Sequence, residues 1–425
     1  MSIILKGGKL FTGTPADIRV EGGRIAAIGS ELVPQPGDEV CDVTGLILAP
    51  GLIDMHVHLR EPGFEYKETI QTGTRAAAKG GVSAVACMPN TKPVTDNAAV
   101  VRFVRERAAQ VGKVKVYPIG AITKGSQGQE LAEMGDMLRE GAVAFSDDGR
   151  PVENGQTMRL ALTYAQNFGA LCISHCEDLA LANGGVMNEG YMSTILGLRG
   201  VTRAAEEAMA ARDILIAEAI GGRVHIAHVS TRGTVELVRQ AKARGVQVTC
   251  ETAPHYFALT DECVQGYDAD TKVNPPLRTA DDVAAVKEGL RDGTIDCIVT
   301  DHAPHHVDEK RVEYNLAASG ISGLETSLAL ALTHLVRPGV LTLPQLVERM
   351  SAAPARILGV EGGCLEEGAA ADILAFDPDL AWTVDPAAFE SRGHNTPFKG
   401  QELRGQARHL LVNGKFVLRD GEVLA

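Results

Sequence analysis

The stretch Gly51-Leu-Ile-Asp-Met-His-Val-His-Leu-Arg60 is an apolar segment that ends in two histidines, His56 and His58. Residues two apart in a strand point to the same face, so both imidazoles would leave one strand end side by side. Such a pair binds one metal ion and leaves positions open for other ligands and a water. An isolated His-x-His pair also arises by chance, so its meaning depends on the rest of the chain.

Apolar segments of strand character alternate with alanine-rich helical stretches over residues 51–359. The expected strands cover residues 52–58, 82–88, 114–119, 142–146, 170–175, 223–229, 246–251 and 295–300. This alternation is the pattern of parallel βα units. Eight such units predict a (β/α)8 barrel, and an open doubly wound sheet is the alternative.

Both ends of the chain consist of short strand patterns separated by Gly-Gly and Pro-Gly turns. In the C-terminal part, Asn413-Gly414 between two such patterns is a strong hairpin signal. We therefore predict one discontinuous β-sandwich domain, formed by residues 1–50 and 360–425, beside a barrel domain of residues 51–359.

The chain carries 41 Lys and Arg against 54 Asp and Glu, a formal charge of −13. This charge argues against binding to nucleic acid or to an anionic membrane, since both need basic surfaces. We find no signal-peptide pattern and no apolar run approaching about 18 residues, so we expect no membrane span. The 8 cysteines are scattered, as expected of free thiols, and we predict a cytoplasmic protein.

Polar side chains stand at the C-terminal ends of most predicted strands, where barrel enzymes carry their chemistry. In chain order they are His56, His58, Arg60, Asn90, Asp147, Asp148, His175, His228, Glu251, His255, Asp301 and His302. Histidines and carboxylates in this number predict a site for a pair of divalent metal ions. Spacing alone leaves the choice between Asp147 and Asp148 open. His225 lies three residues before His228, so we expect it to face the other way and to be structural.

Several segments together resemble dihydroorotases of the amidohydrolase superfamily, of the longer bacterial type. They are GLIDMHVHLREPG, VACMPNTKPVTDN, FSDDGRPV, ISHCED, HIAHVST, ETAPHYF, KVNPPLR and TDHAPH, and the similarity covers nearly the whole chain. The resemblance implies a binuclear zinc site on a distorted barrel. It assigns His56 and His58 to the first ion, His175 and His228 to the second, Asp148 as the bridge, and Asp301 to the first ion.

The resemblance also implies an activity, the reversible cyclisation of N-carbamoyl-L-aspartate to (S)-dihydroorotate in pyrimidine biosynthesis. In ring opening, Asp301 would take a proton from the attacking water and pass it to the departing ring nitrogen. Arg60, two residues past His58, would grip the substrate carboxylate bidentately. Asn90 and His305 would help to hold that carboxylate, and Asn274 would contact the ring amide. We further expect residues 302–325 to close over the substrate as a lid.

Two other readings stay open. A hydantoinase- or allantoinase-like cyclic amidase is the first, but many such relatives bridge their metals with a carboxylated lysine where FSDDG has none. An inactive structural partner of aspartate transcarbamoylase is the second, although such a partner should have lost ligands that are all present here. We expect a homo-oligomer, and an active enzyme that assembles with aspartate transcarbamoylase is compatible with the sequence.

Overall fold

The computed structural model describes residues 2–425, and its centre is a barrel of parallel strands. The strands are β6 (Leu52–Val57), β7 (Val82–Cys87), β8 (Lys115–Gly120), β9 (Ala144–Ser146), β10 (Cys172–Ser174), β13 (Val224–Ile226), β14 (Val248–Thr252) and β15 (Cys297–Ile298). They are hydrogen-bonded in chain order, from β6 to β15. Beyond β15, His302 pairs with Val57 and its carbonyl accepts from the His58 N–H at 2.8 Å, which brings the two edges together. The predicted barrel is confirmed, and the open sheet is wrong.

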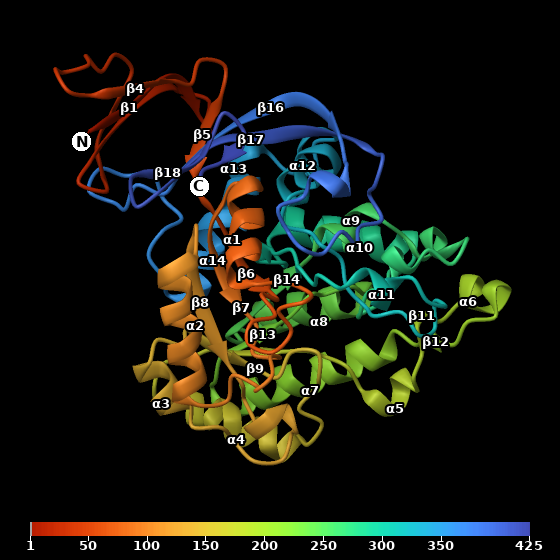
Figure 1. Cartoon of the computed structure of the whole chain (residues 1–425). Coiled ribbons are helices and arrows are strands. Elements are labelled where there is room, and N and C mark those ends of the chain that lie inside the picture. Colours follow the sequence, from red (N-terminus) through yellow and green to blue (C-terminus); the bar gives the residue numbers. More distant parts are fainter. Residues whose placement is uncertain (1) are drawn as a thin grey trace.

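Helices cover the outside of the barrel (Figure 1). The main ones are α1 (Ile70–Lys79), α2 (Ala98–Val111), α3 (Met134–Arg139), α4 (Gly155–Gln166), α7 (Ala204–Ile220), α8 (Arg232–Ala243), α10 (Ala280–Asp292), α12 (Ser327–Ala331), α13 (Leu343–Val347) and α14 (Ala353–Leu358). Helix α1 begins at Thr69, whose side chain caps it in a capping box, and it buries an alanine face against the strands. Strands β6 and β7 are buried at every residue, which explains their continuous apolar runs.

The shorter elements are η1 (Lys124–Ser126), α5 (Leu179–Ala182), β11 (Met187–Asn188), α6 (Tyr191–Leu196), β12 (Gly200–Val201), α9 (Pro254–Ala258), η2 (Asp261–Val264), η3 (Ala269–Thr271), α11 (Val307–Lys310), η4 (Leu332–Val336), η5 (Glu348–Ala352) and η6 (Pro386–Ala388). Most of them lie in the connections between barrel units, whereas η4 and η5 directly follow α12 and α13, and η6 lies between the last long strands of the chain. The segment from α5 to β12 projects from the barrel as an arm (Figure 1). No helix within residues 2–425 is long and apolar enough to cross a membrane.

Both ends of the chain join in one nine-stranded sheet at one side of the barrel (Figure 1). Its strands are β1 (Ile3–Leu10), β2 (Pro15–Glu21), β3 (Arg24–Gly29), β4 (Glu39–Asp42), β5 (Ile47–Pro50), β16 (Ile373–Thr383), β17 (Glu402–Val412), β18 (Lys415–Arg419) and β19 (Glu422–Val423). The antiparallel pair β5–β16 joins the two ends. Asn413 and Gly414 both have positive φ in the β17–β18 hairpin, as this turn requires. The domain boundaries and the sandwich form remain predictions.

Candidate metal centre

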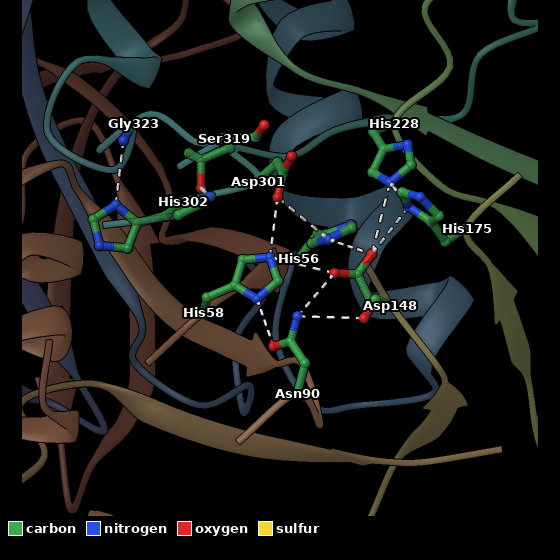
Figure 2. Close-up of polar contacts among 12 residues, drawn as sticks. His56, His58, Asn90, Asp148, His175, His228, Asp301, His302, Ser319 and Gly323 are labelled. Atoms are coloured by element: carbon green, nitrogen blue, oxygen red, sulfur yellow. Dashed lines mark hydrogen bonds and ion pairs between the residues drawn. The ribbon is translucent and has the colours of Figure 1, made fainter. Parts of the chain in front are cut away.

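Six side chains converge at the C-terminal ends of the barrel strands, each less than a tenth exposed (Figure 2). They are His56, His58, Asp148, His175, His228 and Asp301. Asp148 lies at their centre: its Oδ1 is 3.3 Å from His56 Nε2, 3.7 Å from His175 Nδ1 and 3.6 Å from His228 Nε2. Its Oδ2 is 3.4 Å from His58 Nε2. One carboxylate therefore contacts imidazoles on both sides of the cluster.

The cluster fits divalent metal ions by its spacing and by its donors. A four-coordinate zinc ion holds nitrogen ligands about 3.3 Å apart, close to the separations around Asp148. Asp301 Oδ1 adds two more such separations, 3.1 Å to His58 Nε2 and 3.5 Å to His56 Nε2. Among residues 2–425, His56 Nε2 and Asp148 Oδ1 are buried without a hydrogen-bond partner. Unpaired buried polar atoms are costly, and a cation between these two atoms would pair both of them.

Three residues at the rim of this cluster have left-handed backbone conformations. The φ angles are +61° at Arg60, +33° at His228 and +49° at Asp301. Such conformations are unfavourable for residues other than glycine, and they concentrate at functional sites. At His228 the positive φ follows the end of β13, so the side chain turns toward Asp148 after the strand alternation has ended.

The structure distinguishes the two aspartates of the SDDG segment. Asp147 accepts hydrogen bonds from the N–H groups of Ile122 at 2.9 Å and Thr123 at 3.0 Å, and also from the Thr123 hydroxyl. It therefore fastens the end of β8 to the end of β9. Asp148 alone of the two faces the histidines, a choice that spacing had left open.

The charges of the cluster favour ionised carboxylates, whereas its histidines differ from one another. Burial lowers the pKa of His56 and His175, but neighbouring carboxylates, Asp148 among them, outweigh burial and raise it. Burial raises the pKa of Asp301, but His56 and His58 outweigh burial and hold that pKa below its usual range. Burial also raises the pKa of Asp148, and His56 and His228 again reverse the effect. Burial lowers the pKa of His58, which therefore keeps a lone pair for a metal ion. Ionised oxygens and neutral nitrogens are the forms that bind zinc.

Glu251 also belongs to this centre. The sequence places it at a strand end but does not predict its role. Its Oε1 is 2.5 Å from His56 Nδ1, and its Oε2 is 3.1 Å from His225 Nε2. Burial raises the pKa of Glu251, but His56 and His225 outweigh burial and lower it to about 2. A carboxylate on Nδ1 leaves Nε2 of His56 directed at Asp148, an arrangement common behind metal-bound histidines. As predicted, His228 and not His225 lines the cavity, but the His225 ring is not turned away from the centre, because it contacts this carboxylate behind His56.

A cavity of about 230 Å³ opens over the cluster, and all four residues predicted to bind substrate line it. Arg60 Nε donates to the Pro304 carbonyl at 3.3 Å, and its Nη2 lies 3.4 Å from His305 Nε2. Asn274 Nδ2, on another wall, donates to Glu177 Oε2 at 3.1 Å. A guanidinium group and an amide therefore share one cavity with the carboxylates of the cluster.

Asn90 contacts the cluster itself. Its Oδ1 accepts from His58 Nδ1 at 2.9 Å, and its Nδ2 donates to the Asp148 carbonyl at 3.3 Å (Figure 2). This contact fixes the His58 ring with Nε2 toward the carboxylates, as Glu251 does for His56. Two other histidines lie apart: His302 contacts Glu68, and His306 is exposed and caps α11.

Comparisons with known proteins agree with this geometry. The family model described as Dihydro-orotase-like matches residues 45–234. The chain is 59% identical over 425 residues to a dihydroorotase of Pelotomaculum thermopropionicum, covering 99% of both chains. It is 54% identical over 424 residues to a dihydroorotase of Geobacter metallireducens, covering 99% of this chain and 100% of the relative.

Among solved structures, an L-hydantoinase (dihydropyrimidinase) from Arthrobacter aurescens matches 100% of this chain and 97% of its own, with a TM-score of 0.90 and 29% identity. A dihydropyrimidinase from Brevibacillus agri has a TM-score of 0.87 at 24% identity and supports the fold alone. The full-length identity to dihydroorotases is much higher than the identity to these cyclic amidases. The chain belongs to the dihydroorotase family of metal-dependent cyclic amidohydrolases.

Proposed function

We propose that this protein is a dihydroorotase that interconverts N-carbamoyl-L-aspartate and (S)-dihydroorotate, the ring closure of pyrimidine biosynthesis. The observation that carries the proposal is the single cavity that holds Arg60 together with Asp301 and the histidines. Dihydroorotate has a carboxylate on its ring in addition to the amide that reacts. A guanidinium group is the side chain best matched to that carboxylate.

We propose two zinc ions as the cofactor, with Asp148 as their bridge. One ion would be held by His56, His58 and Asp301, and the other by His175 and His228. The contacts of both Asp148 oxygens with imidazoles support a bridge. Bound zinc would supply a water of lowered pKa and would polarise the substrate carbonyl.

Asp301 is the residue that we propose to move the proton. Its low pKa keeps it ionised, so its carboxylate can accept a proton from the attacking water. The same carboxyl group then donates the proton to the ring nitrogen as the amide bond breaks. Ring closure uses the same groups in reverse. In that direction the substrate carboxylate loses an oxygen as water, so closure consumes a proton and gains as pH falls.

The substrate is held at two places. Arg60 would bind the ring carboxylate with help from His305 and Asn90, while Asn274 would contact the ring amide. Burial, and then the nearby cations Arg60 and Lys67, lower the pKa of His305 to about 3. His305 therefore acts as a neutral hydrogen-bonding group, and Arg60 supplies the positive charge.

Purified protein tests the proposal directly when it is supplied with dihydroorotate, hydantoin and allantoin in separate assays. We expect ring opening of dihydroorotate and at least about a hundredfold lower kcat/KM for the two rings that lack its carboxylate. Comparable turnover of hydantoin or allantoin would favour the general cyclic amidase instead. No turnover of any ring by zinc-loaded protein would revive the inactive structural partner.

The proposal also covers the cellular compartment, the oligomeric state and a partner protein. The 8 cysteines are all free, which suits a reducing cytoplasm. We propose a homo-oligomer as the working form, and aspartate transcarbamoylase as a candidate partner. Size-exclusion chromatography with light scattering, with and without the transcarbamoylase, tests both associations.

A further inference from the structure

Asn395 lies in the connection between β16 and β17, far in sequence from the barrel, and only 4% of its surface is exposed. Its side-chain amide uses its full hydrogen-bonding capacity on one loop. The Oδ1 accepts from the His305 N–H at 3.0 Å and from the Ser322 hydroxyl at 3.0 Å. The Nδ2 donates to the carbonyls of Ala303 at 3.1 Å and Gly320 at 2.9 Å.

These four partners form the base of the loop that follows β15. Ala303 and His305 belong to its outgoing arm, and Gly320 and Ser322 belong to its returning arm. Ala303, His305 and Gly320 line the cavity over the metal centre. The Asn395 Oδ1 and Nδ2 each reach both arms, so Asn395 holds them together beside a direct backbone bond there, from the Ala303 N–H to the Ile321 carbonyl at 2.9 Å.

Arg60 depends on the outgoing arm. Its Nε donates to the carbonyl of Pro304, which lies between Ala303 and His305. His305 Nε2 in turn donates to the Ser319 carbonyl at 2.9 Å, across to the returning arm. The two side chains proposed to face the substrate carboxylate are therefore held by backbone that Asn395 fixes.

The segment before Asn395 is fastened to the same loop at a second point. Glu68 is fully buried, and it accepts from Ser391 Oγ at 2.5 Å and from His302 Nε2 at 3.2 Å. The other ring nitrogen of His302 accepts from the Gly323 N–H at 3.2 Å (Figure 2). Between these attachments Gly393 packs on Pro304, where an added Cβ would lie 2.4 Å from the proline Cβ.

We propose that Asn395 is a positioning residue for substrate binding, contributed to the barrel's active site by the segment that links two strands of the terminal sheet. It holds His305 and Arg60 at the separation that a substrate carboxylate requires. Its loss would leave two backbone carbonyls, one N–H and one hydroxyl without their partner. The metal cluster has its own contacts, so substrate binding should suffer more than the chemical step.

The test compares Asn395→Ala with the matched control His394→Ala, which changes the adjacent, exposed side chain. Part of it uses dihydroorotate turnover and so rests on the proposed function. For Asn395→Ala we expect KM for dihydroorotate to rise about tenfold or more while kcat stays within about threefold. We expect wild-type constants for His394→Ala.

Hydrogen exchange resolved to single amides gives a readout that is independent of turnover. The His305 amide is bonded to the Asn395 side chain, whereas the Ser322 amide is bonded to the Asn395 main-chain carbonyl at 2.8 Å. In Asn395→Ala the His305 amide should exchange about tenfold faster or more, and the Ser322 amide should keep its protection. The isosteric Asn395→Asp variant can still accept from the His305 N–H and the Ser322 hydroxyl, but it cannot donate to the carbonyls of Ala303 and Gly320. Its KM for dihydroorotate should therefore rise, while the His305 amide stays protected from exchange.

Unchanged KM and unchanged exchange at His305 in Asn395→Ala would overturn the proposal. So would equal acceleration at His305 and Ser322 with parallel losses in kcat and KM, which would indicate a general structural role. If Asn395→Ala does not fold, the test rests on Asn395→Asp. A wild-type KM for that variant would overturn the proposal. Absence of dihydroorotate turnover in the wild type would overturn the proposed function, and the exchange data would still test the positioning of the loop.

Discussion

Replacing Glu251 by glutamine removes the negative charge that lies between His56 and His225 and preserves the shape of the side chain. In the wild type, Glu251 contacts Nδ1 of His56 at 2.5 Å and Nε2 of His225 at 3.1 Å. An amide cannot accept from both rings at once, because one of its two ends carries an N–H2 group. We therefore expect the His56 ring to lose its fixed orientation toward the metal centre.

The size of the effect follows from the buried charge. The pKa of Glu251 falls from 4.5 to about 2 in the folded protein, which corresponds to roughly 3 kcal/mol of folding stability. Because the folded-state pKa is the lower one, this stability is present above about pH 4.5 and is lost as pH falls toward 2. Loss of a carboxylate behind a metal-bound histidine also weakens metal binding by about 10- to 100-fold.

Two measurements at pH 7 check this prediction. Urea unfolding of the metal-free protein should show Glu251→Gln to be destabilised, and competition with a chromogenic chelator should show weaker zinc binding. Glu206→Gln is the matched control, because Glu206 is also buried but contacts Ser230 and Arg278 instead of a histidine of the cluster. This control should lose stability and keep its zinc affinity within about twofold. Wild-type zinc affinity in Glu251→Gln would refute the role of Glu251 in orienting His56.

Other predictions address the substrate, the pH response and the loop. Arg60→Lys removes the guanidinium fork, so steady-state kinetics should show KM for dihydroorotate raised about 10- to 100-fold with a smaller change in kcat; a wild-type KM would contradict this. Burial raises the pKa of Glu325 to about 8, so the wild type should lose up to roughly 4 kcal/mol as pH rises from about 5 to above 8. When the urea midpoint of unfolding is measured at a series of pH values, the Glu325→Gln variant should not show this loss of stability. Residues 306–318 should exchange amide hydrogens more slowly with dihydroorotate bound, and equal rates would contradict a closing lid.

The barrel could be predicted from the sequence because each strand is an apolar run bounded by polar residues at its end. The predicted bounds were too wide near the last strands: residues 295–300 were expected where β15 pairs only over Cys297–Ile298. Val299 still donates its N–H to the Thr252 carbonyl of β14, but the next N–H, that of Thr300, goes to the Asp54 carboxylate instead of to a neighbouring strand. The side chains that gather around Asp148 could also be predicted, because strand ends of a barrel meet at one face.

Contacts between distant segments could not be predicted in this way. Glu251 meets His56 across 195 residues of sequence, and the His225 ring contacts the other oxygen of the same carboxylate. Asn395 meets His305 across 90 residues. Neither contact produces a local pattern, since each depends on how the barrel closes and how the terminal sheet docks on it. The choice of Asp148 over Asp147 likewise depends on the turn after β9.

The rate of dihydroorotate ring opening, measured together with the zinc content of the same samples, tests the central claim most directly. The account predicts that a chelator abolishes turnover, that zinc restores it at about two ions per chain, and that Asp301→Asn lowers kcat by about a thousandfold or more. Full activity in protein shown to be free of metal, or an Asp301→Asn variant as active as the wild type, would contradict it.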